Sequence, residues 1–321
     1  MVALKKLYIS IFTFFIVVIV FATVLFAFES QRINNVSGLK FSTASGDEFQ
    51  ISVDGINFYQ SLPADVIQEM INEIKFIDIT SMDGINFRTG GYREERDAIP
   101  NEDYISFDLW MRSTELERDV FLINNVSKDI SFDETKTGTF VVSRGAPWIA
   151  RHTFLNGPEI TDVVEKGTFG IYHSSEAIRI SVIELNDDLN PSDSRTEETL
   201  RRFIYDPSEN PERGYGATFG AYSYFFQMAN YYMFPPLERP NTRYRLSDLD
   251  PGNPYQALDN ESWVATLQET SVLDEDGKTY YQAKIRVNIW IEGWDADTFD
   301  ALDRDSVKIQ LQFKIVNKAL I

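Results

Sequence analysis

Clusters of acidic side chains are the first groups in this sequence whose type and spacing suit a chemical role. Calcium takes six to eight oxygen ligands from carboxylates and carbonyls, and three acidic segments have that composition: 187–193, 248–259 and 292–300. None of them fits the EF-hand loop. The third supplies the candidate calcium ligands Glu292, Asp295, Asp297 and Asp300. We predict no cofactor; calcium at this cluster is the one candidate, and helix capping by Asp295 or Asp297 is the rival interpretation of the same residues.

A second unusual segment runs from Gly214 to Leu237, where 24 residues carry no charge and nine are aromatic. Two interpretations stay open. The segment is either a core strand or helix of an inserted subdomain, or an exposed patch that contacts a protein partner or sugar rings. For the second case the candidate binding residues are Tyr222, Tyr224, Phe226, Tyr231 and Tyr232.

Catalytic motifs are missing from the chain. Its only histidines, His152 and His173, form neither an HExxH motif nor a pair four residues apart. There is also no GxSxG elbow, no phosphate-binding glycine loop and no cysteine. We therefore predict a protein that is not an enzyme, and a metal-dependent hydrolase is the least favoured alternative.

The first 28 residues have the pattern of an export helix. Lys5 and Lys6 precede an uncharged run, Leu7 to Phe28, which reaches roughly 33 Å as a helix and so matches a bilayer core of about 30 Å. The lysines place the N-terminus in the cytoplasm and everything after Glu29 outside the cell. We expect a permanent membrane anchor through residues 7–28, with cleavage and secretion as the alternative.

The net charge of the protein limits the kinds of partner that it can bind. The whole chain of 321 residues carries a net charge of −19, and the exported residues 29–321 carry −21. So acidic a protein repels phosphate backbones, which excludes nucleic acid as a partner. The 43% hydrophobic and 14% aromatic content excludes intrinsic disorder.

Many short segments in which apolar and polar residues alternate predict an all-β fold. These segments must position the acidic and aromatic residues. In 284–292 the residues Ile285, Val287, Ile289 and Ile291 point one way and their neighbours the other. Similar segments are 104–112, 120–122, 138–143, 177–184, 263–269 and 307–316. An amphipathic helix is expected over 64–76 and a hairpin over 40–59, with a turn at Asp54-Gly55.

These segments make up one domain in our prediction. Many short strands with Gly and Asp turns are typical of a jelly-roll-like β-sandwich, and we place it at 29–321, after the helix at 1–28. Insertions are expected at about 186–260, where 186–211 and 239–260 are polar and rich in proline. The pentapeptide Asp-Gly-Ile-Asn-Phe occurs at 54–58 and 83–87, which we interpret as similar hairpin chemistry rather than a repeat architecture.

Several segments resemble a known group of exported proteins: FATVLFAF at 21–28, FQISVDGINFY at 49–59, ISFDLWMRS at 105–113, EAIRISV at 176–182, and VNIWIEGWDADTFDAL with VKIQLQF near the C-terminus. The group is the exported β-sandwich surface and matrix proteins of Gram-positive-type bacteria, distantly similar to the camelysin and TasA family with its SipW-type signal. The resemblance implies a surface or matrix protein with a jelly-roll-like sandwich, and no peptidase motif of camelysin relatives matches positions here.

Together these observations predict a membrane-tethered or secreted cell-surface protein with a structural or interaction role. Its expected contacts are the membrane through 7–28, further copies of itself, or a surface glycan or protein. A carbohydrate- or protein-binding module that uses the aromatic segment 214–237 is the alternative.

Overall fold

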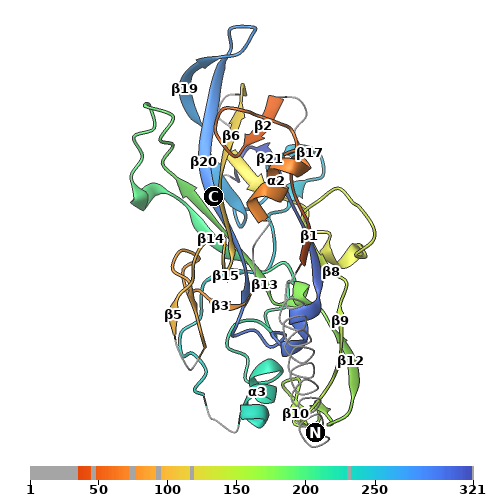
Figure 1. Cartoon of the computed structure of the whole chain (residues 1–321). Coiled ribbons are helices and arrows are strands. Elements are labelled where there is room, and N and C mark those ends of the chain that lie inside the picture. The colour runs from red at the N-terminus through yellow and green to blue at the C-terminus, as the bar shows by residue number, and fades with distance from the viewer. Residues whose placement is uncertain are drawn as a thin grey trace, which may run out of the picture. The chain divides into compact units, whose positions relative to one another are not determined.

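The computed structural model describes residues 35–44, 48–71, 77–91, 95–115, 119–229 and 233–319, and Figure 1 draws the chain. The predicted export helix over 7–28 lies outside these residues, as do Tyr231 and Tyr232. In the part that the structure describes, no helix is long and apolar enough to cross a membrane.

Strand β20 (Thr279–Glu292) is the centre of the larger of two main sheets. It pairs antiparallel with β13 (Ile178–Leu185) on one side and with β6 (Ile105–Ser113) on the other. The sheet is completed by β2 (Phe49–Ser52), β3 (Asp78–Thr80), β4 (Arg88–Thr89), β5 (Arg96–Asp97), β14 (Arg202–Tyr205), β15 (Thr242–Arg243) and β19 (Gln268–Leu273).

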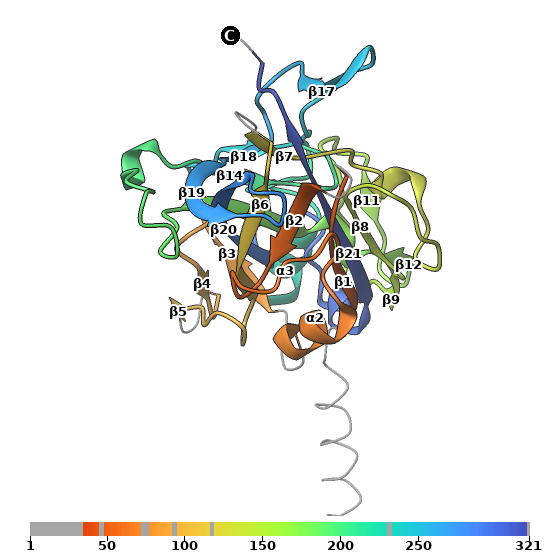
Figure 2. The ribbon, with the colours of Figure 1, turned by 90° about the horizontal axis from the view of Figure 1, so that it is seen from above.

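The smaller sheet is built around β21 (Ser306–Val316). Strand β1 (Asn35–Thr43) runs parallel to β21 along its whole length. The other members are β7 (Asp119–Leu122), β8 (Phe140–Ser143) and β18 (Trp263–Thr266). Figure 2 shows β1 and β21 next to β2 and β6 of the larger sheet.

Shorter elements lie between the strands of the two sheets along the chain. Three two-stranded ribbons are formed by β9 (Ala146–Ile149) with β12 (Phe169–Tyr172), β10 (Phe154–Leu155) with β11 (Val163–Val164), and β16 (Leu249–Asp250) with β17 (Asn253–Ala257). Within the described residues the α-helices are α2 (Ala64–Ile71) and α3 (Ala221–Ala229). The 3-10 turns are η2 (Ser127–Asp129), η3 (Ser174–Glu176), η4 (Glu197–Thr199) and η5 (Asp300–Arg304).

One hydrophobic core lies between the two main sheets. Ile285, Val287 and Ile289 of β20 share a cluster with Leu311 and Phe313 of β21, and all five are fully buried. Strands with one apolar face must bury it against another layer, and here each sheet buries that face against the other. The predicted all-β fold is confirmed.

The second face of the larger sheet is covered as well. Asn288 and Trp290, which the alternation places opposite the core, are 2% and 0% exposed. Trp290 packs edge-on against Phe87, with ring centroids 5.1 Å apart. The amide of Asn288 and the hydroxyl of Ser181 both donate to the carbonyl of Gly84. The loop that joins β3 to β4 therefore forms a third layer.

That loop contains one of the two Asp-Gly-Ile-Asn-Phe segments, and the two segments adopt the same turn. In each, one aspartate oxygen accepts the backbone N–H groups two and three residues later at 2.8–2.9 Å, and the other accepts the Asn amide. The glycines follow at φ +70° and +72°, a region that favours glycine. These hydrogen bonds lower the pKa of Asp54 and Asp83 below the ordinary value, against the opposing effect of burial.

Three sequence predictions need correction. Strands β1 and β2 do not pair as one hairpin over 40–59, because β1 joins the other sheet, although Ile51 and Tyr59 bridge across the predicted turn. The segment 186–211, interpreted as an insertion loop, contains β14, and 239–260 contains β15. The predicted strand 263–269 is divided between β18 and β19. The helix predicted over 64–76 is present as α2 over its described part, and residues 72–76 lie outside the described residues.

Candidate functional site

A cavity of about 350 Å³ lies between α3, the β3–β4 hairpin and the segment that follows β20. Figure 1 shows α3 at the end of the domain away from β19. The aromatic and sulfur-containing lining residues are Tyr222, Tyr224, Phe225, Met228, Met233, Trp294 and Phe299. The charged ones are Asp78, Arg88, Glu95, Asp295 and Asp300. Ligand cavities are typically mostly apolar with a few polar groups and 300–1,000 Å³ in volume, so this cavity has the composition and size of a binding site.

Helix α3 is positioned by the residue that precedes it. Gly220 has φ +64°, and a Cβ atom there would lie 2.1 Å from the carbonyl oxygen of Ala296. The backbone N–H of Ala221 donates to the same carbonyl at 2.7 Å. Only glycine allows this close approach, and it fixes the helix start against the segment 293–300.

Tyr224 and Ala221 are the buried residues of the helix. The ring of Tyr224 packs edge-on against Trp148 and Phe154, with centroids 4.9 and 5.4 Å apart. The side chain is 3% exposed, and its hydroxyl has no hydrogen-bond partner within the described residues. Burial and the charge of Asp300 raise the pKa of Tyr224.

Tyr222, on the same helix, is half-buried and holds the chain beyond the helix. Its hydroxyl donates to the carbonyl of Met233 at 2.6 Å. Tyr222 and Met233 both line the cavity, so this hydrogen bond positions one side of the wall.

The opposite wall comes from β3 and β4. Thr89 donates its hydroxyl to the carbonyl of Asp78 at 2.8 Å, which ties the two strands together. Arg88 is held by two carboxylates, with its Nε 3.1 Å from Glu95 and its Nη1 2.6 Å from Asp97. Its hydrogen bond to Glu95 raises the pKa of Arg88.

At the end of β20, Glu292 is fully buried below the cavity wall. Its two oxygens accept from the indole N–H of Trp290 at 3.0 Å and from the backbone N–H of Trp294 at 3.2 Å. Burial raises the pKa of Glu292 to about 7, against the opposing effect of these hydrogen bonds.

Next to it, Arg179 is completely buried between two carboxylates. Its guanidinium donates to Asp295 and also lies 2.9 Å from Asp206, an ion pair without hydrogen-bond alignment. Burial raises the pKa of Asp295 to about 8, and Arg179 opposes that rise. Burial alone would lower the pKa of Arg179, but Asp206 and Asp295 raise it.

The predicted calcium ligands are therefore already engaged in different contacts. Glu292 binds backbone and indole donors, Asp295 binds Arg179, and Asp297 binds Arg213 through two of its nitrogens at 2.6–3.0 Å. Of the four, Asp300 is exposed on the cavity wall. Among the described residues, no group of three or more carboxylates or histidines is arranged to hold a metal ion.

The predicted aromatic patch is divided between core and surface. Tyr224 is buried and Tyr222 half-buried, and both line the cavity. Phe226 is 37% exposed and is not a lining residue. The predicted positions 231 and 232 lie outside the described residues.

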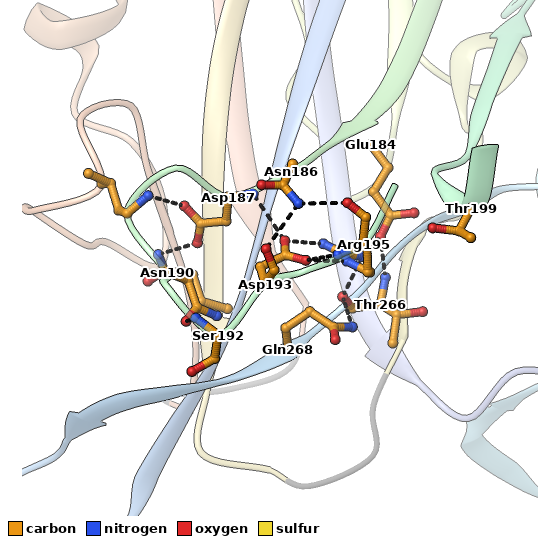
Figure 3. Close-up of polar contacts among 12 residues, drawn as sticks. Glu184, Asn186, Asp187, Asn190, Ser192, Asp193, Arg195, Thr199, Thr266 and Gln268 are labelled. Atoms are coloured by element: carbon orange, nitrogen blue, oxygen red, sulfur yellow. Dashed lines mark hydrogen bonds and ion pairs between the residues drawn. The ribbon is translucent and has the colours of Figure 1, made fainter. Parts of the chain in front are cut away.

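The acidic segment 187–193 has a structural role, and Figure 3 shows Asp187 and Asp193 near Glu184 and Arg195. Asp187 accepts from the indole of Trp110 at 3.0 Å and from the amide of Gln282 at 2.7 Å. Asp193 and the buried Glu184 both bind Arg195. These contacts fasten the loop after β13 to the larger sheet. In the segment 248–259, Asp259 likewise accepts from Arg245 at 2.8 Å.

The nearest approach to a nucleophile and base is Ser143, whose hydroxyl lies 3.2 Å from Nδ1 of His173. The neighbouring carboxylate, Asp305, accepts instead from the hydroxyl and backbone N–H of Ser174 and from Gly145. Neither Ser143 nor His173 lines the cavity.

Sequence reasoning found the acidic and aromatic residues as two separate candidates. The structure brings Tyr222 and Tyr224 together with Asp295 and Asp300 in the wall of one cavity. The sequence analysis missed Trp294 and Phe299, although both lie within the acidic segment 292–300; they add aromatic surface to the cavity wall. Nothing in the sequence indicated the wall from β3 and β4, because that wall depends on a parallel pairing between residues 78–79 and 291–292.

A scan against protein-family models, a search of curated proteins and a search of solved structures find no match for this chain.

Proposed function

We propose that this protein is an exported cell-surface binding protein that takes a small ligand in the cavity under α3. One observation carries the proposal: aromatic side chains and carboxylates from three distant parts of the chain converge on a single cavity of about 350 Å³. Flat rings supply contact area for a sugar ring or another flat apolar group, and carboxylates accept hydrogen bonds from its hydroxyl or amino groups.

A role at the cell surface is supported by the sequence of the first 28 residues and by the acidity of the remainder. In this proposal the protein is tethered through residues 7–28 or secreted after cleavage. It acts by binding and not by catalysis, so it serves a structural or interaction role. Protease treatment of intact cells tests the location: digestion of the acidic domain supports export, and its protection contradicts it.

Ligand-observed NMR with a panel of neutral oligosaccharides and small aromatic fragments tests the binding site. We expect hits that disappear in a Trp294→Ala or Tyr222→Ala variant and persist in Phe169→Ala, since Phe169 is an aromatic residue 63% exposed outside the cavity. Each variant is first checked for an unchanged melting temperature. A panel without hits, or hits insensitive to both cavity variants, contradicts the proposal.

A further inference from the structure

The ribbon of β9 and β12 turns an apolar face to solvent. Phe169 pairs with Ile149, and Ile171 pairs with Pro147, so these four side chains lie together on one side of the ribbon, here called the ribbon face. Ile149, Phe169 and Ile171 are 57%, 63% and 59% exposed, and Pro147 is exposed as well. Antiparallel strands usually present polar residues to water. A cluster of exposed apolar side chains instead marks a surface that contacts a protein or a membrane.

The opposite face holds the ribbon on the domain. Trp148 and Tyr172 alternate with the exposed residues, and their rings pack edge-on, 5.1 Å apart, against a buried cluster. One carboxylate holds both ends of the ribbon. Asp305 accepts the backbone N–H of Gly145, just before β9, at 2.7 Å, and that of Ser174, just after β12, at 2.8 Å. The ribbon face is therefore presented outward by a well-supported element.

The ribbon leaves the domain at the end where β1 begins. Strand β8 runs antiparallel to β21 with Ser143 opposite Val307, and the N–H of Arg144 donates to the carbonyl of Ser306 at 2.9 Å. Strand β1 runs parallel to β21, and its first residue, Asn35, also pairs with Ser306. Figure 1 shows β9, β12 and β10 at the end of the domain away from β19. The ribbon and the chain that precedes β1 therefore leave from the same end of the sheet.

The length of that preceding chain limits its distance from a bilayer. The proposed anchor ends at Phe28, and an extended chain covers at most about 3.5 Å per residue, so residues 28–35 span no more than roughly 25 Å. Ile149 stands five residues beyond Arg144, which is about 17 Å along a strand. The ribbon is long enough to cross most of this gap. In a tethered protein the bilayer is then an apolar environment within its reach.

Charge favours lipid over a second copy of the chain as the partner of the ribbon face. Residues 29–321 carry a net charge of −21, so that two copies repel each other at low salt. The four residues of the ribbon face are uncharged. A zwitterionic lipid surface adds no net charge to the contact, and burial of Phe and Ile side chains at the acyl boundary stabilises it.

We propose that the ribbon face is a second membrane-contact site, which inserts into the interfacial region of a zwitterionic phospholipid bilayer. This inference rests on the membrane tether in the proposed function and is independent of the cavity ligand. An anchor alone leaves the domain able to rotate on its linker. Anchor and ribbon face together hold it in one orientation on the membrane.

Lipid-borne quenching of a dye on the ribbon face tests this contact. The chain has no cysteine, so Phe169→Cys gives a single site for an environment-sensitive dye. The labelled full-length chain is reconstituted into phosphatidylcholine vesicles with and without a nitroxide on the acyl chains. We expect a loss of fluorescence with the nitroxide. Val272→Cys, 54% exposed on β19 at the other end of the domain, is the control and should show no loss.

A second label tests the native side chains of the ribbon face. Lys166→Cys places the dye at an exposed position before β12 and leaves the ribbon face intact, so quenching is again expected. Adding Ile149→Ser and Ile171→Ser should abolish it. The matched pair Val272→Ser and Leu273→Ser should leave it unchanged. All four side chains are exposed, so the melting temperature of each variant should equal that of the parent.

Failure of this inference is distinguishable from failure of the proposed function. If the chain floats with the vesicles but the dye at 169 is not quenched, or is quenched no more than at 272, the membrane contact is wrong and the tether stands. An emission shift at 169 that requires a high protein-to-lipid ratio and occurs without quenching assigns the ribbon face to a second copy. If the chain does not float with the vesicles, the tether is wrong and this inference fails with it, whereas the NMR panel still decides the cavity.

Discussion

Replacing Glu292 with glutamine should change how the stability of the protein depends on pH. Glu292 is fully buried, and its pKa is about 7 in the folded protein against an ordinary 4.5. Above pH 4.5 the unfolded chain releases this proton while the folded chain keeps it. The free energy of unfolding therefore falls between about pH 4.5 and 7 and is level above that range, as far as this residue is concerned.

The magnitude follows from the shift. A change of one pKa unit corresponds to about 1.4 kcal/mol, so the rise at Glu292 costs the folded state about 3 kcal/mol by pH 8. In a domain of this size that corresponds to a melting temperature roughly 6 °C lower. Asp295, whose pKa is about 8, also lowers the free energy of unfolding as the pH rises.

Glutamine cannot release a proton in this range. Between pH 4.5 and 8 the free energy of unfolding should therefore fall by about 3 kcal/mol less in Glu292→Gln than in the parent. The stability of Glu292→Gln at pH 4.5 is lower, because one amide N–H must face a donor, either the Trp290 indole or the Trp294 backbone N–H. Urea unfolding followed by tryptophan fluorescence at several pH values measures both effects. The exposed Glu275→Gln should show the parent's dependence, and an identical pH dependence in parent and Glu292→Gln would refute the reasoning.

Three further predictions concern stability. Gly84→Ala should lower the free energy of unfolding by about 3 kcal/mol, because φ is +72° and the new Cβ would lie 2.6 Å from Ser181. Gly277→Ala is the control, with a similar φ and nothing within 4 Å, and should cost only about 1 kcal/mol. Urea unfolding measures both. Glu184→Gln should cost about 3 kcal/mol, because it removes the buried carboxylate shared by Arg195 and Arg201; Arg195 keeps Asp193, but Arg201 loses its ion-pair partner. Glu198→Gln, at an exposed site, is the control, and equal melting temperatures for the two variants would contradict this prediction. Addition of calcium or EDTA should leave the melting temperature unchanged, since the acids at 292–297 are already engaged by internal donors, and a rise with calcium would reveal a site bound only by the folded state.

Local pattern was enough to predict four long strands of the core, β6, β13, β20 and β21. The period of two in 284–292 identified the core face of β20 correctly, because burying alternate side chains requires that pattern. It could not show that Asn288 and Trp290 on the other face are also covered, since the covering loop comes from residues 81–87.

Pairing between distant strands was not predictable in the same way. The parallel pairing of β1 with β21 joins residues about 270 positions apart and leaves no local trace. Strand β14 was missed because only four residues, RFIY, stand within a polar segment. The cavity depends on such pairings, so its aromatic and acidic residues were identified but their convergence was not.

The repeated turn at 52–58 and 81–87 allows the same turn to be compared in two surroundings within one protein. The two copies share the residues Ser-x-Asp-Gly-Ile-Asn-Phe and the same internal hydrogen bonds, but they pack on different neighbours: Gly55 lies against Leu189 and Trp110, and Gly84 against Ser181 and Ile204. Matched substitutions such as Asn57→Ala and Asn86→Ala therefore remove the same local contact, and the difference between their effects isolates the surroundings. A single protein thus contains a thermodynamic comparison that usually requires two unrelated hosts.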